Sequence, residues 1–356
     1  MEAAVDWSMG AQAARLADWG VASEIGRRAA GPGARVPAVT RARMREDFAE
    51  LVPRAEELIA GFTGLRAEGF RSRAWVMSRG EWIDANLRGL QRMLEPLAVR
   101  VLAGRTERAE LRKKALGAQI GGLLGYVSRK VLGQYDVFLP PDDDGLLYFV
   151  GPNVAETERR FGLPTRDFRL WLSLHEVTHR VQFGAAPWLR GHLSGLIEHY
   201  LRTIALDGRE LLRQVARAIE EIRAGADWRG PNALLLLMTP EQRELFHSMQ
   251  AVMSLLEGHA SYVMNRVADG RVQDLRRMRG SLEQRRHASG VERVFQRAIG
   301  FESKVRQYDV GERFVAMVVE GAGMEGLNLV WRGPANLPGV SEIAAPERWL
   351  ERVAPG

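Results

Sequence analysis

Two histidines and the glutamate beside the first of them have the clearest chemical potential in this chain. His175 and His179 are four residues apart, and Glu176 directly follows His175, in the run WLSLHEVTHRVQF. Four residues advance an α-helix by about 6 Å and by roughly 40° around its axis, so both imidazoles can bind one metal ion. Glu176 then lies beside the ion, where it can take a proton from metal-bound water. The alternative is a pair of histidines satisfied by hydrogen bonds, but the apolar, well-bounded helix around them favours a metal site.

A catalytic zinc site needs a third protein ligand and an open position for water. In the run LFHSMQAVMSLLEGHASYVMNRV, a narrow polar stripe on an apolar helix contains Gln250, Ser254, Glu257 and Ser261. A carboxylate in apolar surroundings costs several kcal/mol unless it has a partner, and a cation would offset that cost. We therefore predict that Glu257 is the third ligand. An ion pair with one of the many arginines is the alternative.

Hydrolysis of an amide also needs a hydrogen-bond donor to the oxyanion of the tetrahedral intermediate. Tyr308, Tyr200 and His199 are the candidates, and each of them could equally be a packing residue. His259 lies two residues after Glu257, which rotates it by about 200° around the helix. We predict that His259 is a packed or supporting histidine and not a ligand.

Composition narrows the alternatives. The chain has 356 residues, of which 46% are hydrophobic and 26% charged, so it can bury a large core. It has no cysteine, which excludes thiolate zinc sites, iron–sulfur clusters and a cysteine nucleophile. Any metal must therefore be held by His, Asp or Glu.

The net charge of +6 does not point to nucleic acid, because charges of both signs alternate along most segments. The best basic stretch, RVQDLRRMRGSLEQRRHASGVERVFQR, contains acidic residues and has the periodicity of a solvated helix face. The first 20 residues lack the basic end and continuous apolar run of a signal peptide, and no stretch approaches the roughly 18 uncharged apolar residues of a membrane helix. We expect a cytoplasmic protein with no nucleic-acid or membrane partner.

Apolar residues three and four apart dominate the sequence and predict a mainly α fold. Only QYDVFLP and GLLYFVGPN indicate β structure, as a small hairpin or two edge strands. We predict an N-terminal helical segment at 1–34, marked off by the Gly- and Pro-rich linker 31–37, and a helical domain at 35–356. Helices are expected at residues 8–30, 40–59 with a break at Pro53, 78–101, 106–132, 154–161, 165–183, 188–206, 208–224, 240–268, 281–298 and 302–319.

Four glycines in the expected helix 106–132 predict a close helix crossing. Gly117, Gly121, Gly122 and Gly125 place small residues on neighbouring turns, so another helix can approach the backbone. Each of them costs up to about 1 kcal/mol in helix propensity.

His175, Glu176 and His179, followed 78 residues later by Glu257, resemble the gluzincin arrangement of zinc metallopeptidases. A wider set of segments resembles an actinobacterial family of zincin-like proteins labelled hydrolases or zinc-dependent metalloproteases. Some members of that family are named for an association with deazaflavin-cofactor biosynthesis. The resemblance extends over nearly the whole chain from Arg35 onward. It is carried by LGQYDVFLP, LLYFVGPNV, DFRLWLSLHEVTHRVQF, PWLRGHL, LLEGHASYVM, KVRQYDVGERFV and GMEGLNLVW.

This resemblance implies a zincin-like metallopeptidase architecture, with zinc bound by His175, His179 and Glu257. It also implies that Glu176 is the general base and acid, and that residues 145–153 form an edge strand along which a peptide or protein substrate can lie by main-chain pairing. One departure is Ser261, which stands where many gluzincins have a supporting Asp four residues after the ligand Glu.

The alternative is a catalytically inactive zincin-like scaffold or protein-interaction module with a structural metal. In that case a fourth protein ligand, such as His259 or Tyr308, would close the coordination sphere.

Overall fold

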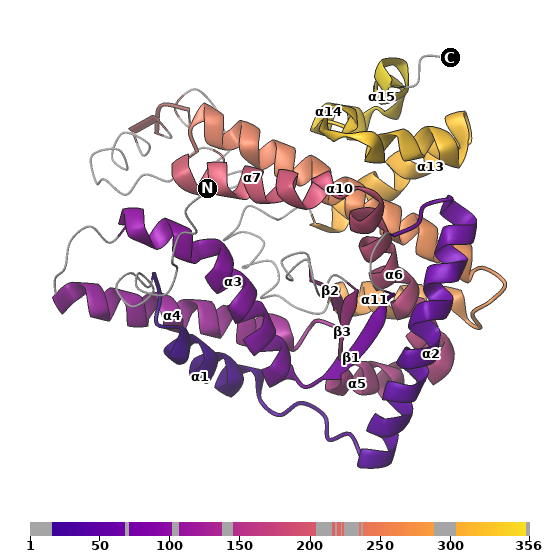
Figure 1. The fold of residues 1–356 in the computed structure, drawn as a ribbon, viewed down its shortest axis with the longest axis horizontal. Helices are drawn as coiled ribbons and strands as arrows, with labels where there is room; N and C mark the ends of the chain where they lie inside the picture. Colours follow the sequence, from indigo (N-terminus) through magenta and orange to yellow (C-terminus); the bar gives the residue numbers. More distant parts are fainter. Residues whose placement is uncertain are drawn as a thin grey trace, which may run out of the picture.

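The computed structural model describes residues 16–67, 71–101, 107–136, 145–203, 216–217, 219–221, 223, 235, 238–287 and 304–353. Within these ranges, the backbone alone is described for residues 95–101, 107–109, 282–287 and 304–309. The fold is mainly α with a small three-stranded sheet, as predicted (Figure 1). The helices are α1 Trp19–Ala30, α2 Ala38–Thr63, α3 Arg79–Val101, α4 Glu107–Ser128, α5 Gly151–Phe161, α6 Thr165–Ala185, α7 Trp188–Thr203, α10 Pro240–Ala268, α11 Leu275–His287, α13 Lys304–Asn328, α14 Val340–Ala344 and α15 Pro346–Val353.

The sheet has the order β1-β3-β2, with strands β1 Arg73–Met77, β2 Gly133–Tyr135 and β3 Leu146–Val150. Strand β3 pairs with β1 in parallel and with β2 in antiparallel orientation. The prediction that residues 145–153 form an edge strand is therefore wrong, because β3 is the central strand and residues from 151 onward belong to α5. The signal was present in the sequence, since an apolar run without alternation is typical of a strand buried on both faces. Strand β1 was not predicted.

Alternate residues of β3 enter two different hydrophobic cores, as the pleat of a strand requires. Leu147 and Phe149 belong to the main core with α2, α6, α10 and α13, where Phe48 of α2 stacks on Phe149 at 3.8 Å between ring centroids. Tyr148 and Val150 belong to a second core with α1, α3 and α4. The sheet thus separates the two helical groups, and α6 lies in the main core.

Helix α2 continues through Pro53, so the predicted break is wrong. A proline inside a helix costs about 3 kcal/mol. Here the buried residues on both sides of it, which include Leu51, Val52 and Ala55, hold the helix in the main core. The expected helix 208–224 lies almost entirely outside the described residues, as does the second half of the one expected at 281–298.

The predicted glycine crossing is confirmed for three of its four members. A Cβ atom at Gly117 would clash with the carbonyl oxygen of Asp18, just before α1, and one at Gly121 with that of Ala22 in α1. A Cβ atom at Gly125 would lie 2.6 Å from the carbonyl oxygen of Gly26, also in α1. Gly122 faces open space. Helix α1 therefore packs backbone to backbone on α4. The domain boundary at residues 34 and 35 stays a prediction.

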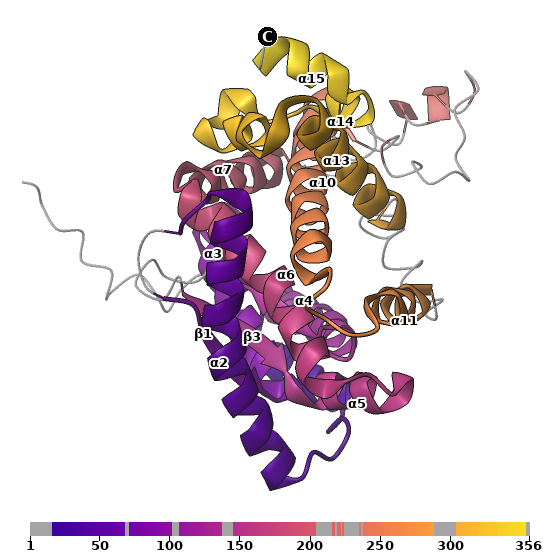
Figure 2. The same cartoon turned by 90° about the vertical axis from the view of Figure 1, so that its right-hand side faces the viewer.

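By length and composition alone, the stretch Val310–Arg332 could cross a membrane. However, Phe314, Val318 and Val330 are buried in the main core, and the backbone leaves helical geometry at Gly323. Figure 2 shows α13 lying beside α10 in the upper half of the molecule. This stretch is therefore weak evidence for a membrane span.

Candidate metal centre

Two well-defined helices position the candidate ligands. Helix α6 is buried on most of its surface, and His175 and His179 are among the partly exposed residues in the middle of it. Helix α10 begins at a capping box in which Thr239 and Gln242 satisfy each other's backbone N–H groups. The two helices pack together in the main core. The ligand side chains are therefore carried by rigid elements.

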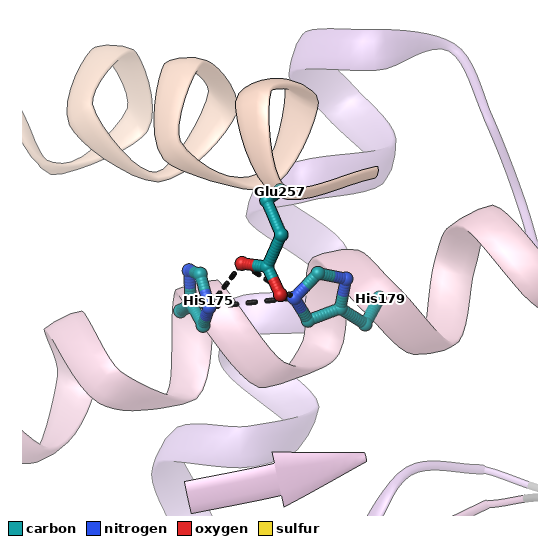
Figure 3. A group of neighbouring side chains, drawn as sticks. All are labelled: His175, His179 and Glu257. Carbon is teal, nitrogen blue, oxygen red and sulfur yellow. Dashed lines mark hydrogen bonds and ion pairs between the residues drawn. The ribbon is translucent and has the colours of Figure 1, made fainter. Parts of the chain in front are cut away.

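The structure brings His175, His179 and Glu257 together, with one possible ligand atom from each within 4.8 Å of the others. Figure 3 shows Glu257 reaching down from α10 to the two imidazoles on α6. The Nε2 atoms of His175 and His179 are 3.3 Å apart, and Oε2 of Glu257 lies 3.7 and 3.8 Å from them. Ligand atoms at about 2.0–2.1 Å from a tetrahedral zinc ion are roughly 3.3 Å from one another. Two imidazole nitrogens and one carboxylate oxygen at these separations fit zinc.

The side chain of Gln182 fixes the orientation of His179. Its Nε2 donates to the carbonyl oxygen of Leu256 at 2.9 Å, and a carbonyl can only accept. Its Oε1 must therefore face Nδ1 of His179, at 3.0 Å, and accept a hydrogen bond from it. This hydrogen bond places a proton on Nδ1 of His179 and turns Nε2 of the ring towards the site, where its lone pair can bind a metal ion.

His259 is turned away from the ligand cluster. Its Nδ1 accepts the second N–H of Gln182 at 2.9 Å, and its ring packs edge-on to Trp331 at 5.2 Å between centroids. Burial and, to a smaller extent, the nearby His179 lower the pKa of His259 to about 3, so His259 is neutral. These contacts agree with the predicted supporting role and not with a fourth ligand.

Glu176 is buried beside the cluster, against strand β2. Its Oε2 accepts a hydrogen bond from the backbone N–H of Tyr135 at 3.1 Å. A Cβ atom at Gly133 would lie 2.6 Å from Oε1, so only glycine leaves room for the carboxylate there. Burial and the negative charge of Glu257 raise the pKa of Glu176 and the Tyr135 N–H opposes the rise, which leaves the pKa at about 8. A carboxyl with a raised pKa is suited to accepting a proton near neutral pH.

A close contact between α10 and α13 stands directly next to Glu257. A Cβ atom at Gly258 would clash with the backbone of Gly311, and one at Gly311 would clash with the carbonyl group of Ser254. The two glycines thus set the distance between the helices. Glu257, one residue before Gly258, takes its position from this contact.

The three oxyanion candidates have different outcomes. His199 bonds to Glu241 at 2.9 Å on the surface, and Glu241 is about 24 Å along α10 from Glu257. Tyr200 lies at the same end of α7, so neither residue is placed to contact an oxyanion at the cluster. Tyr308 lies in α13, about one turn before Gly311, and its side chain is outside the described part of the structure.

The sequence reasoning missed Gln182, Gly133 and Tyr135. Gln182 could have been found, because it lies three residues after His179 and so on the same face of α6. The backbone N–H of Tyr135 and the bare Cα of Gly133 have no signature in the sequence. Their importance depends on how β2 lies against α6.

With this fold and this cluster, the chain belongs to the family of zincin-like metallopeptidases, which it matches over residues 17–350. A crystal structure described as that of a candidate hydrolase with a novel fold, from Chloroflexus aurantiacus, is similar throughout, with 34% sequence identity and a TM-score of 0.72. The similarity covers 96% of this chain and 100% of that one. No curated protein matches the chain. The function is therefore that of a metallopeptidase-like hydrolase in its broad class.

Proposed function

We propose that the protein is a zinc-dependent metallohydrolase that cleaves peptides, with His175, His179 and Glu257 as zinc ligands and Glu176 as the general base. The observation that carries this proposal is the convergence of two Nε2 atoms and one carboxylate oxygen at 3.3 to 3.8 Å, with a second carboxylate buried next to them. A bound zinc ion would supply Lewis acidity for the activation of water and the polarisation of the scissile carbonyl.

The remaining chemistry belongs to the chain's own residues. The Tyr135 N–H holds Oε2 of Glu176, which leaves Oε1 to accept the proton of the attacking water. Glu176 then returns this proton to the nitrogen of the leaving amine. Gln182 keeps Nε2 of His179 unprotonated by accepting the hydrogen bond from its Nδ1. Tyr308 stays the candidate donor to the oxyanion.

For the substrate, we propose an extended peptide that pairs with β2 and not with residues 145–153. Strand β2 lies at the edge of the sheet. It pairs with β3 on one side, where Gln134 is in register with Tyr148, and with no described strand on the other. The N–H of Tyr135 is already used by Glu176, so this side of β2 faces the catalytic helix and the peptide would pair with other main-chain groups of the strand. An extended chain could therefore add to the sheet beside the base.

The alternative scaffold with a structural metal is less well supported. It needs a fourth protein ligand, and His259 is hydrogen-bonded to Gln182 instead. Within the described part of the chain, the cluster contains three ligating side chains, which leaves a position for water or substrate.

The test is to load the purified protein with zinc, to measure its zinc content and to incubate it with a peptide library read by mass spectrometry. We expect one zinc per chain and defined cleavage products from the wild type. Glu176→Gln should keep the zinc and yield no products, whereas His175→Ala combined with His179→Ala should lose the zinc. Full zinc content in the double histidine variant, or the same products from Glu176→Gln, would overturn the proposal.

A further inference from the structure

A cationic cavity of about 420 Å³ lies between the loop that joins α1 to α2 and the C-terminal ends of α4 and α5. It is lined by Arg79 at the start of α3, Arg129 and Lys130 just after α4, and Arg159 and Arg160 in the last turn of α5. Glu156 is the carboxylate among its described lining residues. Figure 2 shows α5 in the lower half of the molecule and α10 in the upper half.

The negative C-terminal ends of two helices compensate only part of this positive charge. The C-terminus of a helix carries about half a negative charge, which favours cations near it. The ends of α4 and α5 together with the charge of Glu156 amount to about two negative charges. Against the five cations that line the cavity, this leaves a surplus of roughly three positive charges.

The floor of the cavity is a preorganised arginine. Arg79 is only 8% exposed. Its Nε donates a hydrogen bond to Oδ1 of Asn153 at 2.7 Å, and its Nη1 donates one to the carbonyl oxygen of Ala30 at 3.1 Å. Its Nη2 donates to Glu156 at 3.3 Å. Asn153 is held in turn by two backbone carbonyls, at 2.7 and 2.6 Å. Two of the five N–H groups of Arg79 are not used in these bonds. Its guanidinium therefore has a fixed position with donors to spare.

The loop between α1 and α2 forms one wall. Gly33 has a φ of +72°, and a Cβ atom on it would lie 3.0 Å from Cζ of Arg79 and 3.0 Å from Cβ of Pro152. Glycine therefore lets the backbone pass directly over the guanidinium. The wall is closely packed against the floor.

Several of the cations have no carboxylate partner in the described residues. Lys130 lies over the ring of Tyr126 and Arg160 over the ring of Phe161, at 5.8 and 5.3 Å from the centroids. Arg159 is exposed and forms no ion pair with a described residue. Burial lowers the pKa of Arg79, the charge of Glu156 opposes this fall, and the nearby charge of Arg129 adds to it.

We propose that this cavity binds a small anion that carries one or more phosphate groups. A phosphate group carries about −1.5 to −2 charges at neutral pH and offers three acceptor oxygens, which matches the surplus of cations. Arginine binds phosphate through two parallel N–H···O bonds, and most of the cations here are arginines. A volume of about 420 Å³ is in the usual range for small-molecule sites. The proposal does not depend on the metal centre.

The experiment is isothermal titration calorimetry of the full chain with inorganic pyrophosphate and with inorganic phosphate, at about 0.15 M salt. Arg129→Gln combined with Arg159→Gln should weaken the binding of the tighter probe at least about tenfold. A matched control is Arg313→Gln combined with Arg348→Gln, since both arginines are exposed and lie on α13 and α15. The control should bind within about twofold of the wild type.

Circular dichroism and the zinc content should be the same for all variants. If the double variant does not fold, Arg159→Gln alone replaces it, because Arg159 is exposed. The proposal is overturned if neither probe binds to the wild type, or if both pairs of substitutions weaken binding equally. It is also overturned if duplex DNA or anionic phospholipid vesicles bind while pyrophosphate and phosphate do not, since the cations then form a surface for a macromolecule or a membrane.

Discussion

Oε1 of Gln182 lies 3.0 Å from Nδ1 of His179, and the same amide group reaches Leu256 and His259 on α10. One side chain therefore joins the helix with the two histidines to the helix with Glu257. Many gluzincins have an Asp four residues after the ligand Glu, where this chain has Ser261. Gln182 supports a ligand from α6 instead, by a hydrogen bond to the imidazole nitrogen that faces away from the site.

Replacing Gln182 should weaken zinc binding. In Gln182→Leu, Nδ1 of His179 has no acceptor, and the ring is free to rotate or to change tautomer. Loss of such a supporting hydrogen bond costs about 10- to 100-fold in metal affinity. Competition with a chromophoric chelator measures this change. The control Gln119→Leu, on the exposed face of α4, should have the wild-type affinity. An unchanged zinc affinity in Gln182→Leu would show that the hydrogen bond has no role in binding.

Gly133→Ala should lower the turnover number and leave zinc bound. Its Cβ would lie 2.6 Å from Oε1 of Glu176 and must displace the carboxylate, while the three ligands are on other elements. A misplacement of about 1 Å in a catalytic group can cost about 100-fold in rate. Steady-state kinetics and metal analysis read the two effects separately. Gly195→Ala, on an exposed position of α7 with open space around it, is the control. Wild-type turnover in Gly133→Ala would refute the proposed position of the base.

Much of the candidate site could be predicted from local patterns. The spacing of His175 and His179 specifies one helix face, and the polar stripe that contains Glu257 marks a carboxylate entering an apolar region. The structure brings all three together. Their binding of zinc stays a prediction. The environment of Glu176 could not be predicted, because it depends on a backbone N–H 41 residues earlier in the chain.

The fold was predictable to a similar extent. The helices followed from their periodicity, and the glycines at Gly117, Gly121 and Gly125 correctly indicated a close crossing. Sheet order was not accessible, because β1 is separated from β3 by two helices in the sequence and pairs with it in parallel. Short apolar runs do not show which strand is central. For the same reason, 145–153 was misplaced at the edge.

Zinc should stabilise the folded protein through the ligand cluster. The ion would bind the folded state, in which α6 and α10 hold the ligands together, and such binding adds about 2.7 kcal/mol when free zinc is 100 times its dissociation constant. Calorimetry with zinc and with a chelator should give a higher melting temperature with zinc. Glu176→Gln should retain this increase, and the double variant His175→Ala with His179→Ala should lose it. An equal increase in the double histidine variant would place the zinc at another site.

The C-terminal region should lose stability in acid through Glu342. Its carboxylate accepts hydrogen bonds from Arg352 at 2.6 and 3.0 Å and from the N–H of Gly339 at 2.8 Å, and Arg352 holds the pKa of Glu342 below its usual value. Because the folded-state pKa is lowered, the stabilisation is fully present above the unfolded pKa of about 4.3 and is lost as the pH falls through the folded value.

Its size should be about 1 kcal/mol or less, since Arg352 is 42% exposed. Urea unfolding of the wild type and Glu342→Gln should show a difference in the free energy of unfolding near pH 7 that disappears in acid. Glu347→Gln, at an exposed position of α15, serves as the control. A difference that is the same at both pH values would mean that the charge of Glu342 is not what stabilises this region.

Adjacent glycines in α4 offer a paired test of the helix crossing. In Gly121→Ala, the new Cβ meets the carbonyl oxygen of Ala22, and the backbone of α1 must move away. Overpacking of this kind costs about 1–3 kcal/mol. In Gly122→Ala, the new methyl group faces open space, so the higher helix propensity of alanine should stabilise the protein by about 0.5–1 kcal/mol.

The two variants have the same composition and differ by one position on one helix. Their free energies of unfolding in urea should therefore change in opposite directions. If both changed in the same direction, the approach of α1 to Gly121 could not be as close as the structure has it.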